Sequence, residues 1–222
     1  MTATRVMRTA GWTLISLGIV VLLYLVYLLF FTNLQNQRAQ NDLLDRWGLE
    51  FGDPDDRLPG EGTPGPHEPV DPGDAYAVMW FERPGSTVRP VHEEDLYIVE
   101  GVSLDDLKRG PGHYATTAAP GGRGNFAVSG HRTTYGAPFY HLETLVAGDE
   151  IHVVDRELRE WVYIVREQQI VGPSDTWVLG DDPLNTGERM LTLTTCHPRF
   201  SAQQRLIVFA ELQLPEKSGG AT

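Results

Sequence analysis

A run of apolar residues near the N-terminus constrains this chain more than any other feature. Residues 12–31 read WTLISLGIVVLLYLVYLLFF, 20 positions without a charged side chain. A helix of that length spans the hydrocarbon core of a bilayer, which is about 30 Å thick. The run passes into Thr32 and Asn33 without the small-residue cleavage site of a signal peptide. It therefore predicts a transmembrane helix that stays attached to the chain.

Basic residues are sparse on both sides of this predicted span. Arg5 and Arg8 precede it closely, whereas Arg38 and Arg46 lie further along on its other side. The positive-inside rule thus favours a cytoplasmic N-terminus only slightly, but nearly all of the chain follows the span. We expect residues 1–11 in the cytoplasm and the remainder outside it, as in a single-pass protein of the cell membrane.

Two segments of different composition follow the span. Residues 32–51 are typical of a juxtamembrane helix, because Leu43, Trp47 and Phe51 recur at helical spacing. This apolar stripe could lie on the membrane surface or pack on the later domain. Residues 52–74 are rich in Pro, Gly, Asp and Glu, a composition that cannot bury enough apolar surface to fold. We expect them to form an extended linker that could reach on the order of 70 Å.

The remainder of the chain, residues 75–215, alternates short β-like runs with turns and precedes a flexible tail at 216–222. Eight such runs in about 140 residues favour a small closed barrel, because closure removes exposed strand edges. Short helical pieces near 104–108 and 138–145 interrupt the runs. The predicted fold is mainly β: a closed eight-stranded β-barrel with short helices, preceded by a transmembrane helix and a linker. The strands are expected at residues 76–81, 96–99, 125–130, 150–154, 161–167, 176–179, 190–196 and 206–212.

Charge and composition exclude several kinds of binding site. The formal net charge is −12, and no basic stretch could neutralise the phosphates of a nucleic acid. The chain has neither a phosphate-binding loop nor a dinucleotide fingerprint. One cysteine and scattered histidines give no metal-ligand spacing. We therefore expect no nucleic acid, no metal and no cofactor.

Cys196 is the only cysteine of the chain. A lone cysteine can be a small buried hydrophobe, which leaves a structural role open. In the expected strand 190–196, Leu191 and Leu193 point to one face and Cys196 points to the other, because successive side chains alternate. Met190 shares the face of the cysteine. The alternation nevertheless favours a thiol outside the leucine core.

Two further residues at strand ends could act with this thiol. Arg205 follows Cys196 after an eight-residue loop, so an antiparallel hairpin would bring the two together. An arginine there could stabilise an oxyanion and favour the thiolate. His131 ends another expected strand and could activate the thiol and protonate a leaving amine. The three would form a cysteine acyl-transfer site, with His141 and His197 as alternatives for the histidine.

Two motifs around these residues resemble those of sortases. Residues 192–196 read TLTTC and precede Arg205, which is similar to the TLxTC…R signature of that family. Residues 120–132 read PGGRGNFAVSGHR, which is similar to the segment that supplies the sortase histidine, and GPGHY at 110–114 also fits. The resemblance covers about residues 75–214. The stretches HRTTYGAPF and CHPRFSAQQRLIVFA resemble class E sortases of actinobacteria most, with class D next.

This resemblance implies an enzyme and its site. Cys196 would be the nucleophile, His131 the general acid and Arg205 the residue that holds the substrate and stabilises negative charge, while Thr195 would help to position substrate. A sortase cleaves a C-terminal LPxTG or LAxTG sorting motif of surface proteins between Thr and Gly. It transfers the acyl group to an amine of a peptidoglycan precursor. Two alternatives stay open: a membrane-anchored cysteine hydrolase, and a non-catalytic anchored β-module that binds surface proteins.

Overall fold

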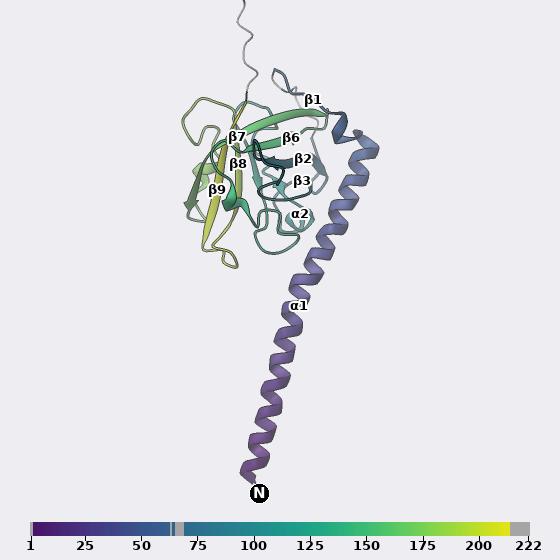
Figure 1. Cartoon of the computed structure of the whole chain (residues 1–222), viewed down its shortest axis with the longest axis vertical. Helices are drawn as coiled ribbons and strands as arrows, with labels where there is room; N and C mark the ends of the chain where they lie inside the picture. Colours follow the sequence, from purple (N-terminus) through teal and green to yellow (C-terminus); the bar gives the residue numbers. More distant parts are fainter. Residues whose placement is uncertain (1, 63, 65–68, 214–222) are drawn as a thin grey trace, which may run out of the picture.

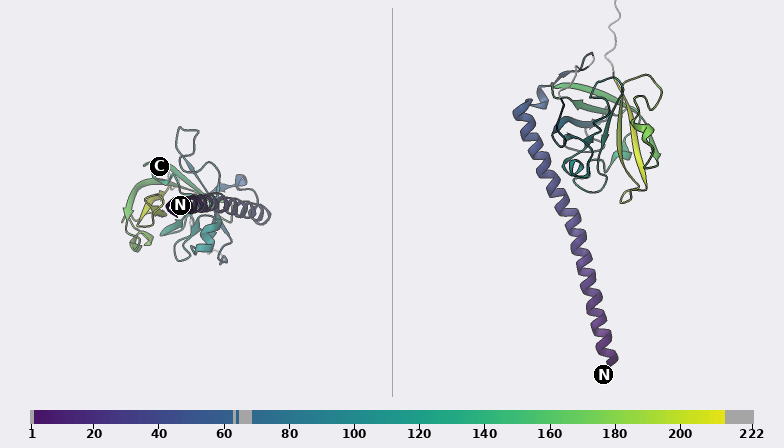
Figure 2. Two further views of the ribbon diagram at one scale, coloured as in Figure 1. Left: turned by 90° about the horizontal axis from the view of Figure 1, so that it is seen from below. Right: turned by 180° about the vertical axis from the view of Figure 1, so that it is seen from behind.

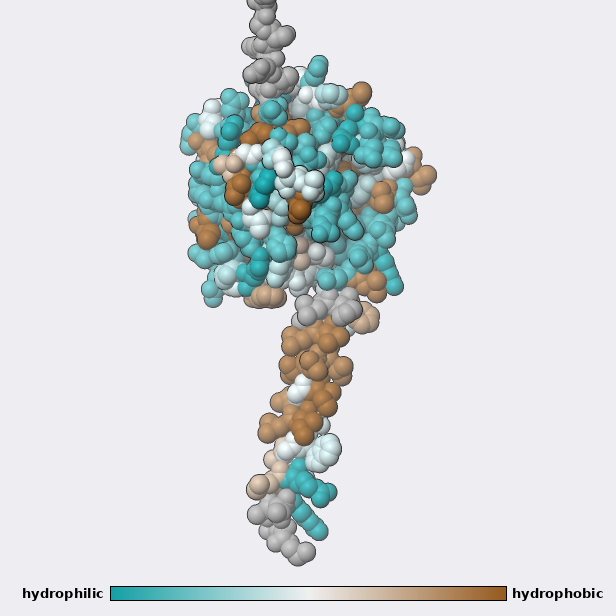
Figure 3. Space-filling view, in the orientation of Figure 1, coloured by the Kyte–Doolittle hydropathy of each residue, from teal (hydrophilic) through white to brown (hydrophobic). Residues whose placement is uncertain are grey.

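The longest element of the computed structural model is α1, a helix of 49 residues from Thr2 to Glu50 (Figure 1). The structure describes residues 2–62, 64 and 69–213. At 1.5 Å per residue α1 is roughly 70 Å long. It continues without a break from the predicted span into the predicted juxtamembrane helix. Among the described residues it is the one helix long and apolar enough to cross a membrane, and its apolar part projects beyond the rest of the molecule (Figure 3).

The second part of α1 packs against the outside of the following domain. Leu43 and Trp47 are fully buried there, in a cluster that also contains Val78 and Tyr97. The rings of Trp47 and Tyr97 meet edge to face with centroids 6.2 Å apart. Of the two roles left open for the apolar stripe, the structure shows packing on the domain.

Side-chain amides of α1 extend this contact towards the N-terminus. Asn36 Nδ2 donates to the carbonyl oxygens of Lys108 and Arg109 at 3.2 and 3.1 Å. Gln40 Nε2 donates to the carbonyl oxygens of Tyr97 and Arg109, and its Oε1 accepts from the Tyr97 amide at 2.9 Å. The carbonyls at the end of a helix lack partners within it, so α1 satisfies those of the short helix that ends at Arg109. The docked face of α1 thus combines apolar burial with specific hydrogen bonds.

Removing the largest buried side chain of this face is expected to weaken the docking strongly. Trp47→Ala should lower the free energy of unfolding by about 3 kcal/mol or more, because it leaves a cavity between α1 and the barrel. Denaturant unfolding of the full chain in detergent micelles measures the change. Leu49→Ala is the matched control, since Leu49 lies two residues away and is 90% exposed. Equal effects of the two substitutions would contradict the docking.

Eight strands of the described chain close into a barrel, as predicted. Their order is β7-β6-β2-β3-β4-β5-β8-β9, and the pairing of β9 with β7 completes the ring. Most neighbours are antiparallel, but β3–β4 and β5–β8 are parallel. The strands are β2 (Ala75–Glu82), β3 (Leu96–Glu100), β4 (Gly112–His113), β5 (Asn125–Ser129), β6 (Glu150–Val154), β7 (Arg159–Val171), β8 (Met190–His197) and β9 (Gln204–Leu212).

The interior of the barrel is filled by alternating apolar side chains. Leu191 and Leu193 of β8 and Val208 of β9 are fully buried in one cluster with Phe126 and Val128 of β5. Because apolar side chains fill the interior, polar groups of these strands must face outward or find hydrogen-bond partners. The barrel therefore presents its chemistry on its outer face and rims.

Some expected elements differ from the observed ones. The strand expected at 176–179 is wrong: these residues form a 3-10 turn, since a short apolar run does not distinguish a strand from a helical turn. The eighth strand is instead β4, which has two residues and so shows no alternation. The helical piece expected at 138–145 is reduced to one turn. The short helices are η1 (Pro54–Asp56), α2 (Leu104–Arg109), η2 (Leu142–Thr144) and η3 (Thr176–Leu179).

The expectation of a free linker at 52–74 is wrong for residues 52–62. There β1 (Leu58–Pro59) pairs in parallel with the start of β7. The Arg57 guanidinium lies 4.7 Å from the Trp80 ring centroid, and its Nε lies 3.2 Å from Glu160 Oε2. Backbone pairing and cation–π contact need little apolar content, so composition did not reveal them. The predicted tail at 216–222 lies outside the described residues.

Candidate active site

Cys196 and Arg205 lie directly opposite each other on neighbouring strands. They are register partners in the antiparallel pair β8–β9, as the predicted hairpin required. Leu191 and Leu193 of β8 face the barrel interior, so Cys196, an odd number of residues further along, faces outward. Its thiol is free and half-buried. The structure thus confirms the face that strand alternation assigned to the cysteine.

His131 lies two residues after the end of β5, the strand that pairs with β8 on the side away from β9. The parallel pair β5–β8 has Ser129 opposite Thr194, and the Gly130 amide continues the ladder by donating to the Thr194 carbonyl at 3.0 Å. Extending this register by two residues from Ser129 sets His131 beside Cys196. Cys196 and Arg205 are thus paired across β8 and β9, and the extended register predicts His131 next to them at the rim of the barrel.

The alternative histidines are placed less favourably. His197 follows Cys196 in β8 and pairs with Gln204, so its side chain points to the face opposite the thiol. His141 precedes η2 and is exposed, with its ring against Tyr140. His131 and His197 are both half-buried, and each has one ring nitrogen, Nε2 of His131 and Nδ1 of His197, without a hydrogen-bond partner among the described residues, so the face of the strand is what favours His131. His131 is the histidine best placed to exchange a proton at this site.

Arg205 keeps donors available beside the thiol. Its Nη1 donates to the carbonyl oxygens of Ala202 and Gln204, both at 3.0 Å. A guanidinium has five N–H donors, and these two bonds use only one of its nitrogens. The remaining nitrogens can donate to a carbonyl or an oxyanion bound over Cys196.

Thr195 is buried rather than exposed to a substrate. It is 2% exposed, and its Oγ1 donates to the Gly130 carbonyl at 2.7 Å. This bond fixes the backbone just before His131 to the backbone just before Cys196. Direct contact of Thr195 with substrate stays a prediction, while the observed bond gives it a role in holding the two segments together.

Arg132 is a site residue that the sequence reasoning missed. It is only 4% exposed, and its Nη1 donates to the carbonyl oxygen of Cys196 at 3.2 Å. Its Nη2 lies 2.7 Å from Glu143 Oε2, and its Nε donates to the Tyr140 carbonyl at 3.3 Å. One buried guanidinium thus connects the backbone of Cys196 to the segment that follows His131. Its position next to the motif histidine was the only signal in the sequence.

Arg199 strengthens the same connection from the other side. It forms an ion pair with Glu143, and its guanidinium lies 4.1 Å from the centroid of the Tyr140 ring. Arg132 and Arg199 therefore share one carboxylate. The loops that follow the histidine and the cysteine are held together by this cluster.

The loop between β7 and β8 lies against the outer face of β8. Asn125 Nδ2 donates to the carbonyl oxygens of Val178 and Gly180, both at 3.0 Å, and Asn125 Oδ1 accepts from Thr192 Oγ1 at 2.8 Å. These bonds hold η3 on the outer face of β8. Tyr114 lies on that face as well, with its hydroxyl 3.3 Å from Thr194 Oγ1.

The pattern of the sortase domain family matches residues 89–213, more than half of this chain. The chain belongs to the sortase family. Members of this family are cysteine transpeptidases, and the row of His131, Cys196 and Arg205 agrees with that chemistry. The sortase is 33% identical over 221 residues to Sortase SrtE1 of Streptomyces coelicolor. That alignment covers 92% of this chain but only 56% of the curated relative's length.

Solved structures support the same relationship. Sortase E from Streptomyces avermitilis is 38% identical, with a TM-score of 0.54 over 65% of this chain and 91% of that one. A Clostridium perfringens Sortase D5 transpeptidase is 27% identical, with a TM-score of 0.59 over 81% of this chain and 98% of that one. The resemblance to class E and class D sortases that the motifs indicated is confirmed.

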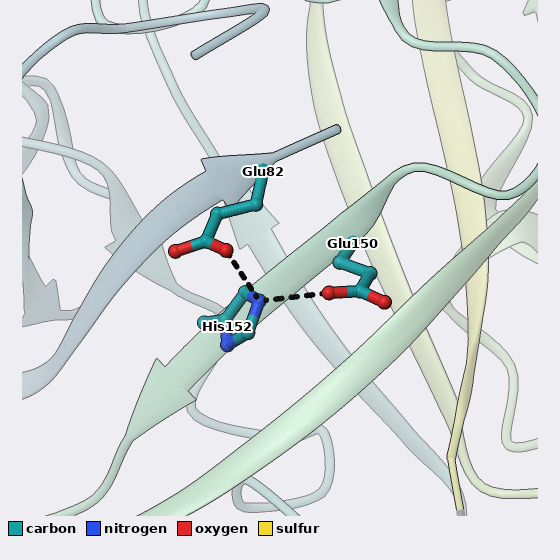
Figure 4. Close-up of side chains that lie close together, drawn as sticks. All are labelled: Glu82, Glu150 and His152. Atoms are coloured by element: carbon teal, nitrogen blue, oxygen red, sulfur yellow. Dashed lines mark hydrogen bonds and ion pairs between the residues drawn. The ribbon is translucent and has the colours of Figure 1, made fainter. Parts of the chain in front are cut away.

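One cluster of metal-ligating side chains lies on strands of the sortase that do not carry this row. Glu82, Glu150 and His152 point towards one another from β2 and β6 (Figure 4). His152 Nε2 lies 3.3 Å from Glu150 Oε2 and 3.8 Å from Glu82 Oε2. Its Nδ1 is 2.7 Å from Glu160 Oε1, and its ring stacks on Trp80. These contacts tie β2, β6 and β7 of the sortase together, and the three side chains could hold a divalent cation.

The environment of His131 favours its neutral form. Burial lowers the pKa of this imidazole, and the positive charge of Lys108 lowers it further. The unfolded chain has the ordinary value of about 6.5. Neutral His131 therefore stabilises the fold above that pH, and the stabilisation is lost as the pH falls through the lower pKa of the folded state.

Removing the nearby charge should raise this pKa. Lys108→Met is expected to shift the titration of the His131 imidazole to higher pH, though not to the ordinary value, because burial remains. NMR titration of the ring protons measures the shift. Arg166→Met is the control, since Arg166 pairs with Glu211 and does not contribute to the pKa of His131. An unchanged titration in Lys108→Met would contradict this account.

Proposed function

We propose that this sortase is anchored in the cell membrane by α1 and anchors surface proteins. It cleaves a C-terminal sorting motif of LPxTG or LAxTG type between Thr and Gly. It then transfers the acyl group from Cys196 to an amino group of a peptidoglycan precursor. The N-terminus lies in the cytoplasm and the barrel lies outside it. The observation that supports the proposal is the pairing of Cys196 with Arg205 in the β8–β9 hairpin, next to the parallel strand β5 that leads to His131.

The first half-reaction uses the three side chains in different roles. The Cys196 thiolate attacks the carbonyl carbon of the motif threonine, and Arg205 donates hydrogen bonds to the resulting oxyanion. His131, protonated, gives its proton to the leaving glycine nitrogen as the peptide bond breaks. A thioester on Cys196 and a free amine are the products. The lowered pKa of His131 makes this proton transfer easier.

The second half-reaction uses the same groups in reverse. An acceptor amine attacks the thioester carbonyl, and Arg205 again stabilises the oxyanion. Neutral His131 takes the proton from the attacking nitrogen, and the Cys196 thiolate leaves. The Cys196 thiolate and the protonated His131 are thereby restored, so the site can react with another sorting motif. Water in place of the amine would give hydrolysis.

A peptide panel tests this function. The full chain in detergent micelles is incubated with LPxTG and LAxTG peptides, and the acyl-enzyme is detected as a mass increase on the peptide that contains Cys196. Adding an acceptor amine should release a new amide in preference to the free acid. Release of free acid alone would identify a hydrolase. A thiol inert to every peptide and to alkylating agents would indicate a non-catalytic binding module.

A further inference from the structure

The docked part of α1 fixes how far the barrel stands from the end of the apolar run. Asn33 Oδ1 accepts a hydrogen bond from the Gly136 amide at 3.1 Å. Gly136 lies in the loop after His131 and has a φ of +75°. A Cβ at this position would clash with Asn36, so the close contact between this loop and α1 requires a glycine. The apolar run ends at Phe31, two residues earlier, which corresponds to about 3 Å along the helix. The loop that follows His131 therefore contacts α1 at the edge of the predicted span.

The catalytic row lies at this same end of the barrel. The hairpin that joins β8 to β9 is at the end of the barrel nearest the apolar part of α1, as both side views show (Figures 1 and 2). Cys196 and Arg205 form the last pair but one of β8 and β9 before the turn of that hairpin. The opposite end contacts the end of α1, where Arg156 Nη2 lies 2.9 Å from Glu50 Oε1.

The tip of this hairpin carries an exposed aromatic side chain. Phe200 is 78% exposed and has a φ of +64°. That backbone region is unfavourable for a bulky residue, and an exposed phenyl ring has no partner in water. Phenylalanine is one of the residues that insert into the boundary between lipid headgroups and acyl chains. A bilayer at this end of the barrel would give the ring an apolar partner that the described residues leave it without.

A groove between α1 and the barrel opens at the same level. Its volume is about 850 Å³, and its lining combines apolar Phe31 and Leu34 with polar His92 and Asp95. An apolar part next to a polar part matches the transition from acyl chains to headgroups. Lipids around α1 would fill this groove once the helix spans a bilayer.

We propose that the end of the barrel carrying Phe200 and Gly136 rests on the bilayer surface, so that Cys196 opens into the headgroup layer. This inference depends on the membrane anchor of the proposed function. The interfacial layer on each side of the hydrocarbon core is about 5–7 Å thick, and the Asn33–Gly136 contact lies within it. A substrate held in the membrane therefore reaches the thiol without leaving the interface.

Lipid-borne quenchers test the contact. The single cysteine is first removed by Cys196→Ala, and Phe200→Cys then provides one site for a fluorescent label on the full chain. The protein is reconstituted into phosphatidylcholine vesicles with brominated acyl chains. The label should be quenched several-fold more strongly than in vesicles without bromine. Glu157→Cys, in the turn next to Arg156 at the opposite end, is the matched control and should show little quenching.

The outcomes separate the two proposals. Flotation of the vesicles measures the anchor itself: protein left behind would overturn both the anchor and this contact. Protein that floats with the vesicles while labels at positions 200 and 157 are quenched equally would overturn the contact alone. Weak quenching at both positions would mean that the barrel stands away from the bilayer, and strong quenching at both that it lies on its side.

Discussion

Cys196→Ala is expected to abolish acyl transfer by the full chain. Without the thiolate no thioester forms, and loss of a covalent nucleophile costs at least about a thousandfold in turnover. The fold should survive, because the side chain is small, half-exposed and outside the barrel core. Mass spectrometry of the acyl-enzyme and chromatography of the transfer product measure the loss. The unfolding midpoint of the same preparation shows that the barrel is intact.

The histidines provide the matched comparison for this prediction. His131→Ala should lose nearly as much turnover as Cys196→Ala, since proton transfer to the leaving amine fails. His141→Ala should retain activity, because His141 is exposed and lies outside the row. A thioester still formed by Cys196→Ala, or equal losses in the two histidine variants, would contradict the assigned site.

Arg132→Met is expected to slow the reaction without touching the reacting atoms. The substitution removes the hydrogen bond to the Cys196 carbonyl and leaves Glu143 to Arg199 alone. Small displacements of a reacting group can cost about a hundredfold, so kcat should fall by about ten- to a hundredfold while KM changes little. The free energy of unfolding should fall by about 2–3 kcal/mol, because Arg132 is buried but Glu143 is partly exposed.

Arg199→Met separates positioning from stability. It breaks the other ion pair of Glu143 but leaves the contact between Arg132 and Cys196 in place. We expect it to lower the free energy of unfolding while kcat stays close to that of the unaltered chain. Arg132→Lys should recover part of the lost kcat, since it retains a donor. Equal losses of kcat in Arg132→Met and Arg199→Met would mean that the cluster acts only through the stability of the fold.

Features with a local period could be predicted from the sequence. The alternation of β8 gave the correct face for Cys196, because Leu191 and Leu193 alternate with polar residues over several positions. The docked face of α1 was visible as a stripe containing Leu43 and Trp47, although its partner was not. From the sequence alone, Asn36 and Gln40 would be expected in solvent. Their role depends on the carbonyl oxygens of Lys108 and Tyr97, to which their side-chain amides donate.

Features that depend on distant partners could not be predicted in this way. Arg132 is held by contacts 11 and 64 residues away along the chain, and an arginine with unknown partners is expected in solvent. The segment around Leu58–Pro59 looked like a spacer, because its composition gives no indication of the free edge of β7. The choice of His131 over the other histidines came from the resemblance to sortases, and only the register of β5 against β8 supplied a geometric reason.

The parallel pairing of β5 with β8 has a consequence for the order in which the protein folds. Cys196 and Arg205 belong to one hairpin, but His131 lies 65 positions before the cysteine, and parallel strands so far apart pair slowly because a long loop must first close. The Cys196 thiol is therefore expected to come next to His131 only after β5 has paired with β8. A chain that is still unfolded therefore carries an ordinary cysteine, and we expect the reactive thiol only in the folded protein.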